Sequence, residues 1–162
     1  MSLREISLSL PNRPGTLAKV ARTLAKERIN VAAISVDSTS SKGRVRLIVN
    51  DPDRALRLLS AAGYSAEARE MIAVRLEDRS GSFLRVLELL AKEKVNLQSV
   101  AILVAREGSQ PLAALSSDDL PRARKILRSA GFASVLAERI VSNADLLASA
   151  PTIPSESVGL LL

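Results

Sequence analysis

The stretches NRPGTLAKVARTLAKERINV (residues 12–31) and DRSGSFLRVLELLAKEKVNL (residues 78–97) are two versions of one segment. Ala62-Gly63-Tyr64 likewise recurs as Ala130-Gly131-Phe132, which indicates a short insertion in the second copy. Two copies are too few for a solenoid, so each copy is expected to be a compact unit. The residues that recur 66 positions later are Arg13, Gly15, Val20, Leu24, Ala25, Lys26, Glu27 and Asn30, as Arg79, Gly81, Val86, Leu90, Ala91, Lys92, Glu93 and Asn96.

The first copy alternates between strand and helix periodicity in a fixed order. Ile6, Leu8 and Leu10 alternate with polar residues, which predicts a strand with one buried face. Further strands are predicted at residues 31–36, 44–49 and 65–71, with a polar hairpin loop at 38–43. The helix between the first two strands has apolar residues on one side and cations on the other: Leu17, Val20, Ala21 and Leu24 against Lys19, Arg22 and Lys26.

A second helix is predicted between the third and fourth strands of this copy. Asp51 and Pro52 are typical of a helix start, and Gly63 is typical of a helix end. The second copy repeats the order, with strands near residues 72–77, 97–105, 111–116 and 134–141. Its helices are predicted near 81–94 and 119–130, and the latter starts from residues 117–119 and Pro121.

This βαββαβ order predicts an α+β fold of two ferredoxin-like sandwiches in tandem. Each has an antiparallel four-stranded sheet with two helices on one face. The first unit is expected to span residues 1–70 and the second 71–141, followed by a C-terminal tail at 142–162. The free sheet faces can be buried by packing on each other, or the sheets can extend edge to edge. A homodimer is expected because open edges remain.

Composition excludes several classes of function. The chain has no Cys and no His, which excludes thiol nucleophiles, disulfides, thiolate metal sites and imidazole chemistry. The lack of Cys fits a reducing cytoplasm. No apolar run approaches the ~18 residues of a membrane helix. The net charge is +6, but basic residues are interspersed with acidic ones and aromatic residues are 2%, so nucleic acid is not expected as a partner.

The repeated turns resemble the signature of the ACT domain family. That signature is a D/N-R-P-G-x-L turn before the first helix, followed by an Asn between apolar residues at the second strand. The first copy has Asn12-Arg13-Pro14-Gly15-Thr16-Leu17 and Ile29-Asn30-Val31, and the second has Asp78-Arg79-Ser80-Gly81-Ser82-Phe83 and Val95-Asn96-Leu97. The resemblance covers residues 3–141. The second copy departs from the pattern at Ser80 and Phe83.

The resemblance implies a regulatory protein that binds a small effector, often an amino acid, at an interface between paired modules. Family ligands lie near the first turn and the start of the second strand. The implied ligand-binding residues are Asn12, Arg13, Pro14, Gly15, Thr16, Leu17, Asn30 and Val31, with Asp78, Ser80, Gly81, Ser82, Phe83, Asn96 and Leu97 in the second copy.

Physical chemistry independently favours a ligand at these turns. Gly15 allows unusual dihedral angles and close approach, and the first amides of the following helix attract a carboxylate. Thr16 and Ser82 offer hydroxyl groups, and the two repeated Asn residues offer a donor and an acceptor each. Asp78 is the candidate partner of an ammonium group. Every one of these residues also has a structural interpretation in a tight turn or a helix–strand bend.

No catalytic, metal or cofactor site is predicted. The paired carboxylates Asp51/Asp53 and Asp118/Asp119 fall at predicted helix starts, where capping explains them. Nucleophile-elbow and phosphate-loop patterns are absent from the sequence. The function is therefore expected to be non-catalytic. The main alternative is a protein-interaction or transcription-regulating adaptor that binds no small molecule. A third possibility, from the net charge of +6, is a nucleic-acid-associated regulator.

Overall fold

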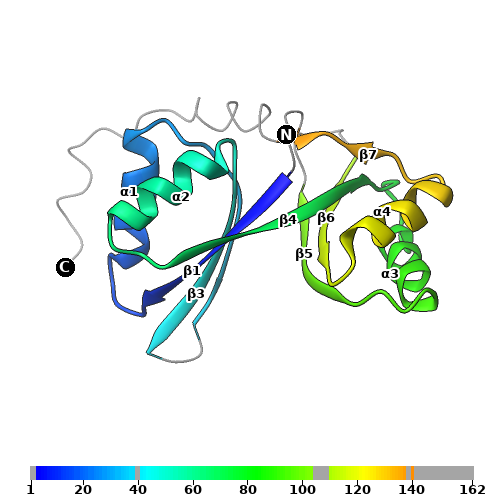
Figure 1. Cartoon of the computed structure of the whole chain (residues 1–162), viewed down its shortest axis with the longest axis horizontal. Coiled ribbons are helices and arrows are strands. Elements are labelled where there is room, and N and C mark those ends of the chain that lie inside the picture. The colour runs from blue at the N-terminus through cyan, green and yellow to red at the C-terminus, as the bar shows by residue number, and fades with distance from the viewer. Residues whose placement is uncertain (1–2, 39–40, 104–109, 138–139, 141–162) are drawn as a thin grey trace.

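The computed structural model describes residues 3–38, 41–103, 110–137 and 140. The first repeat contains β1 (Leu3–Pro11), α1 (Thr16–Lys26), β2 (Val31–Asp37), β3 (Lys42–Val49), α2 (Pro52–Ala61) and β4 (Ala66–Arg75). The second contains α3 (Ser82–Lys92), β5 (Leu97–Leu103), β6 (Leu112–Ser117), α4 (Leu120–Ser129) and β7 (Ser134–Val135). Helices α1 and α2 lie at one end of the molecule, and α3 and α4 lie at the other (Figure 1).

The βαββαβ order and the antiparallel sheets are confirmed, but the two sheets are joined into one curled sheet. Its strand order is β2-β3-β1-β4-β6-β5, with β7 also paired to β4. Two separate strands were expected at residues 65–71 and 72–77, and this is wrong. Strand β4 is continuous, pairing with β1 through Met71 and with β6 from Ile72 onward. Figure 1 shows β4 crossing from one repeat to the other.

The expected strand at residues 134–141 is also wrong, because among its described residues only Ser134 and Val135 form a strand. Val135 pairs with Ala73 of β4, and along the same edge β1 already pairs as far as Met71. A longer β7 would have to displace the start of β1. The chain instead turns helical at Ala137 and Ile140. Residues 104–105 of the strand expected at 97–105 and the tail at 142–162 lie outside the described residues.

Helix ends follow the predicted signals. The Asp51 carboxylate accepts a hydrogen bond from the Arg54 amide at 3.0 Å, and Asp119 accepts one from the Arg122 amide at 3.0 Å. Each cap has a proline in the first helical turn. Gly63 has φ 84° directly after the α2 C-cap, a left-handed conformation that favours glycine. The hairpin loop is shorter than residues 38–43, because β3 begins at Lys42.

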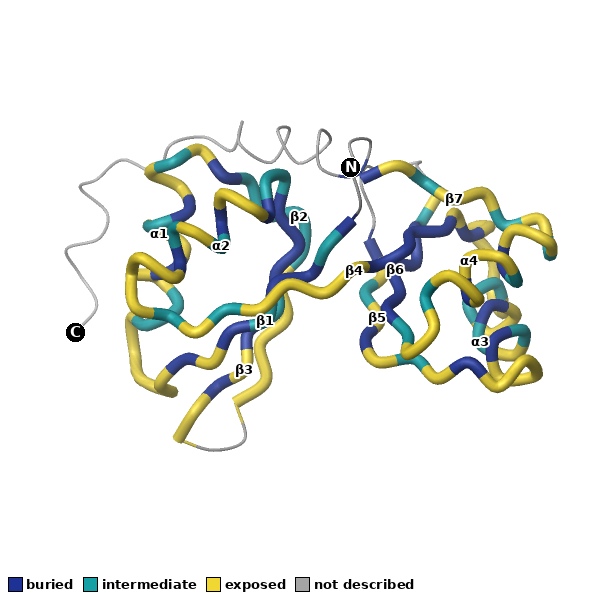
Figure 2. The backbone as a smooth tube through the Cα atoms, in the orientation of Figure 1, coloured by how far each residue is buried: buried dark blue, intermediate teal, exposed yellow. Residues whose placement is uncertain are grey.

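Each repeat has its own aliphatic core between helices and sheet, drawn in dark blue in Figure 2. In the first repeat Val20 and Leu24 of α1 pack on Ile6 and Leu47. Ala21 was expected on the same buried side of α1, but it is exposed. Helix α1 is short and buries only a narrow apolar stripe against the sheet, and Ala21 lies outside that stripe.

A third core lies between the repeats, where the helix-free faces of the sheet meet. Leu3, Ile48 and Met71 of the first repeat pack with Leu103 and Ala114 of the second, among others. Sheet-to-sheet packing thus occurs within one chain. The Ser99 and Ser116 hydroxyls, both buried, hydrogen-bond to each other at 2.9 Å.

The third core predicts that Ile48→Ala costs about 2–5 kcal/mol of unfolding free energy, because Ile48 is 2% exposed. In an isolated first repeat its side chain would face water. Leu84 of α3 is 54% exposed, so Leu84→Ala is the control and should cost below about 1 kcal/mol. Urea denaturation measures both variants. Equal, small losses would show that the helix-free faces do not pack in solution.

Candidate functional site

Both predicted turns have the same backbone geometry. Gly15 and Gly81 are the N-cap residues of α1 and α3, with φ of 81° and 86°. The Thr16 amide donates to the Arg13 carbonyl at 3.2 Å, and the Ser82 amide donates to the Arg79 carbonyl at 3.3 Å. The positive φ angles favour glycine at both positions. A Cβ atom at either glycine would meet nothing within 4 Å, so the space beside each turn is open.

A cavity of about 370 Å³ lies at the turn of the second repeat. Its floor includes Ser80, Gly81 and Ser82, three of the predicted ligand-binding residues. The C-terminal end of α4 forms the opposite wall through Gly131 and its neighbours. The other lining residues come from β4 and the segment after it, from α3, from the segment before β6 and from the segment after α4. They are Arg75, Leu76, Glu77, Arg79, Arg85, Gln110, Ala130, Phe132 and Ala133.

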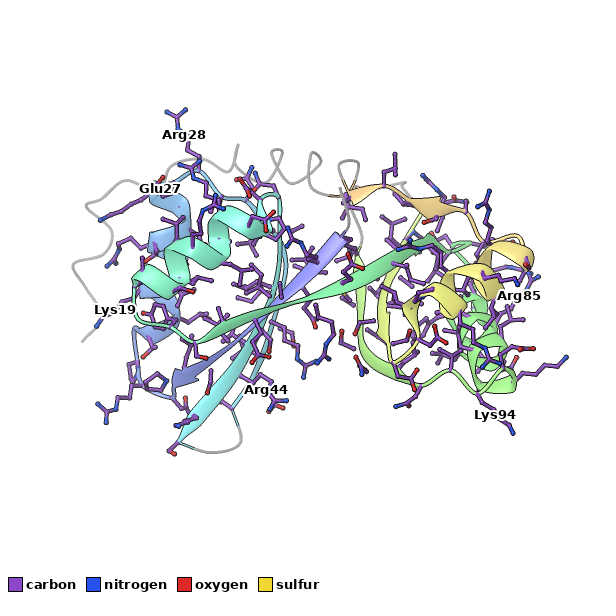
Figure 3. The ribbon with its side chains drawn as sticks, viewed as in Figure 1. Lys19, Glu27, Arg28, Arg44, Arg85 and Lys94 are labelled. Atoms are coloured by element: carbon purple, nitrogen blue, oxygen red, sulfur yellow. The ribbon has the colours of Figure 1, made fainter. Side chains whose placement is uncertain are left out.

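Charges of both signs surround this cavity. The start of α3 carries the positive end of its helix dipole, and the end of α4 carries the negative end. Gly81 has no side chain to cap the first amides of α3, so they retain capacity to donate hydrogen bonds. Arg79 forms an ion pair with Glu77. The Arg85 guanidinium lies 5.5 Å from the centre of the Phe132 ring. Figure 3 labels Arg85 in the second repeat.

Ser82 lines the cavity, and its side chain carries a polar atom without a partner. Its Oγ is buried and has no hydrogen-bond partner among the described residues. Burying a hydroxyl without a partner costs about 1–3 kcal/mol. A ligand atom that accepts a hydrogen bond from Ser82 would remove that cost. The equivalent residue of the first repeat is Thr16, which is half-buried.

The repeated asparagines occupy helix–strand bends. The Asn30 amide donates to Asn50 Oδ1 at 3.0 Å, and the Asn50 amide donates to the Asn30 carbonyl at 3.1 Å. Asn96 and Asp118 make the same reciprocal pair, each bond at 3.1 Å. These backbone contacts tie the start of β2 or β5 to the end of the neighbouring strand. The following residues, Val31 and Leu97, pack against the cores.

Other predicted site residues lie apart from the cavity. Asp78 is exposed and Asn96 is exposed, and neither lines it. Phe83 and its counterpart Leu17 pack against the two repeat cores. Asn12, Arg13, Pro14 and Gly15 are exposed at the first turn and do not line this cavity either.

Sequence reasoning missed most of the lining. Glu77, next to Asp78 in the sequence, is the acidic residue of the lining, and Arg75, Arg79 and Arg85 are its basic residues. Phe132 was visible only as part of the repeated Ala-Gly-aromatic segment. No spacing rule relates the end of α4 to the start of α3, so this wall had no sequence signal.

No grouping of three or more acidic side chains in the described part of the chain has the arrangement of a metal site. The described helices are also too short or too polar to cross a membrane.

Comparison with known proteins places this arrangement in a family. The family model described as an ACT domain pair matches residues 1–127. Protein BT0572 from Bacteroides thetaiotaomicron matches in structure with a TM-score of 0.79 and 22% identity, covering 86% of this chain and 96% of that one. The ligand-free regulatory subunit of aspartate kinase from Thermus thermophilus matches with a TM-score of 0.59 and 19% identity, over 80% and 93%.

The regulatory subunit of aspartate kinase from Thermus flavus gives a TM-score of 0.57 at 19% identity, again over 80% of this chain and 93% of that one. At these identities the structural matches show a shared fold. Among curated proteins, no sequence matches this chain. The family model spans most of the chain and both repeats, and the chain therefore belongs to the ACT domain pair family.

Proposed function

We propose that this chain is a non-catalytic regulatory protein that binds an amino acid in the cavity of its second repeat. The observation that carries this proposal is the cavity between the positive end of α3 and the negative end of α4. A free amino acid has a carboxylate and an ammonium group close together, so it complements two opposed helix ends.

The lining residues extend this match. The carboxylate would accept from the first amides of α3, from Ser82 Oγ and from Arg85. The ammonium group would face the α4 carbonyl groups and Glu77, which takes the part that Asp78 was expected to play. The amino-acid side chain would then lie near Phe132.

The first repeat is a weaker candidate because the corresponding positions differ. At the same 66-residue spacing, Pro11 stands in place of Glu77 and Ser9 in place of Arg75. The turn at Gly15 therefore lacks the acid that would meet an ammonium group. We infer that, of the two turns, the one in the second repeat binds the effector.

A homodimer is the second part of the proposal. The edge strand β2 carries Ile34 and Val36, which are 53% and 51% exposed, on the side of the sheet where α1 and α2 pack. In the second repeat β5 carries Val100 and Ile102 at the equivalent positions, 39% and 48% exposed. Exposed apolar pairs beside unpaired strand edges favour protein contact, and a second copy is the simplest partner.

A thermal-shift screen against the twenty amino acids tests the effector. We expect one or a few related amino acids to raise the melting temperature, because they bind only the native state. Ser82→Ala should weaken the best ligand roughly tenfold or more, since it removes a hydrogen bond to a charged group. Isothermal titration calorimetry measures the affinity.

Thr16→Ala, the matched change in the first repeat, should leave that affinity unchanged. Equal weakening by both changes would contradict binding in the second repeat alone. A melting temperature that no amino acid raises would instead favour the protein-interaction adaptor.

The homodimer is tested by light scattering coupled to gel filtration. We expect the mass of a dimer for the unaltered chain and of a monomer for Val36→Lys, because a charge at a buried apolar edge is costly. Ile102→Lys is the change at the equivalent position of β5, and it shows whether that edge takes part in the same contact. A monomeric unaltered chain would refute this part of the proposal.

A further inference from the structure

A second, polar cleft of about 470 Å³ lies between the two repeats. One wall is the helix-free face of the first repeat, formed by β1, β3 and β4, and Gln98 of β5 belongs to the other wall. The third core occupies the same sheet face further along these strands. The charged residues of the cleft are Glu5, Arg44, Arg46, Glu67 and Arg69.

Strand register places these charges together. Glu5 lies opposite Arg69, and Ser9 lies opposite Arg44. Ser7 lies between its two neighbours Arg46 on β3 and Glu67 on β4. Directly opposed residues of antiparallel strands share one face of the sheet, so the five charged side chains and the serines form one polar surface.

Glu5 is the most unusual member of this surface. It is 7% exposed, and its carboxylate has no hydrogen bond or ion pair with any residue in the described parts of the chain. A carboxylate that no protein group bonds can bind a positively charged group that enters the cleft. Glu5 lines the cleft, so such a group can reach it from the cleft.

The arginines of the cleft also have unused capacity. Arg44, Arg46 and Arg69 make no ion pair with the described residues, whereas Arg4, Arg54, Arg79 and Arg122 all do. Figure 3 shows Arg44 on the side of β3 that faces the second repeat. Guanidinium groups are well suited to holding carboxylates through paired hydrogen bonds.

We propose that this cleft binds a small amino-dicarboxylate, an amino acid with an acidic side chain. Three arginines and two glutamates give the cleft one net positive charge. An amino-dicarboxylate carries two carboxylates and one ammonium group, so it matches both signs and the net charge. Its ammonium group lies against Glu5 and its carboxylates lie against the arginines. The site is separate from the cavity at α3 and does not depend on the function proposed above.

Calorimetric titration of the full chain with L-aspartate, L-glutamate and succinate tests this proposal. Glu5→Gln keeps the shape of the side chain and removes its charge. We expect it to weaken aspartate binding roughly tenfold or more. Succinate binding should not weaken, because succinate has no ammonium group and the substitution makes the cleft more positive. Arg46→Gln should weaken both ligands.

Ser82→Ala is the control for the other cavity and should leave aspartate binding in the cleft intact. The proposal is wrong if neither acidic amino acid binds at millimolar concentration. It is equally wrong if Ser82→Ala abolishes their binding while Glu5→Gln preserves it, which would assign them to the cavity at α3. Loss of aspartate and succinate binding to the same degree in Glu5→Gln would show that Glu5 has only a structural role.

Discussion

The continuous strand β4 is the constraint on which the rest of the molecule depends. It completes the sheet of the first repeat and supplies the central strand of the second, so neither repeat can form its sheet without it. Because one strand cannot bend freely between its two sets of partners, the orientation of the repeats is set by the twist and curl of a single sheet. This shared strand brings the two helix-free faces together and creates the third core. It also leaves β7 only two residues long.

The surface between the repeats has an apolar part and a polar part, and the two have different consequences. The apolar part, around Ile48 and Met71, contributes to stability as any aliphatic core does. The polar part contains charged groups held on rigid strands without partners in the described chain, which is an arrangement that ligands can complete. If Glu5 had only a structural role, it would be expected to bond a nearby cation. None of the described arginines is bonded to Glu5.

The two repeats keep the same backbone but differ in what surrounds it. The turns at Gly15 and Gly81 agree in φ, in their hydrogen bonds and in the helices that follow. The chemistry of a site comes from side chains around such a turn, and there Glu77 and Arg75 have no counterparts in the first repeat. Duplication has therefore preserved the scaffold, while substitutions around the turns distinguish one repeat from the other.

The sequence by itself determined the βαββαβ order, the helix caps at Asp51 and Asp119, the glycine turns and the family, because each depends on periodicity or on residues close together in the chain. Only the tertiary structure decided that residues 66–75 form one strand, that Ile48 is buried and that Glu77 rather than Asp78 lines the cavity. Those outcomes depend on which strand edges pair and which sheet faces pack together between distant parts of the chain. Local patterns carry no information about such contacts, since a strand has the same periodicity whether it ends a sheet or joins two.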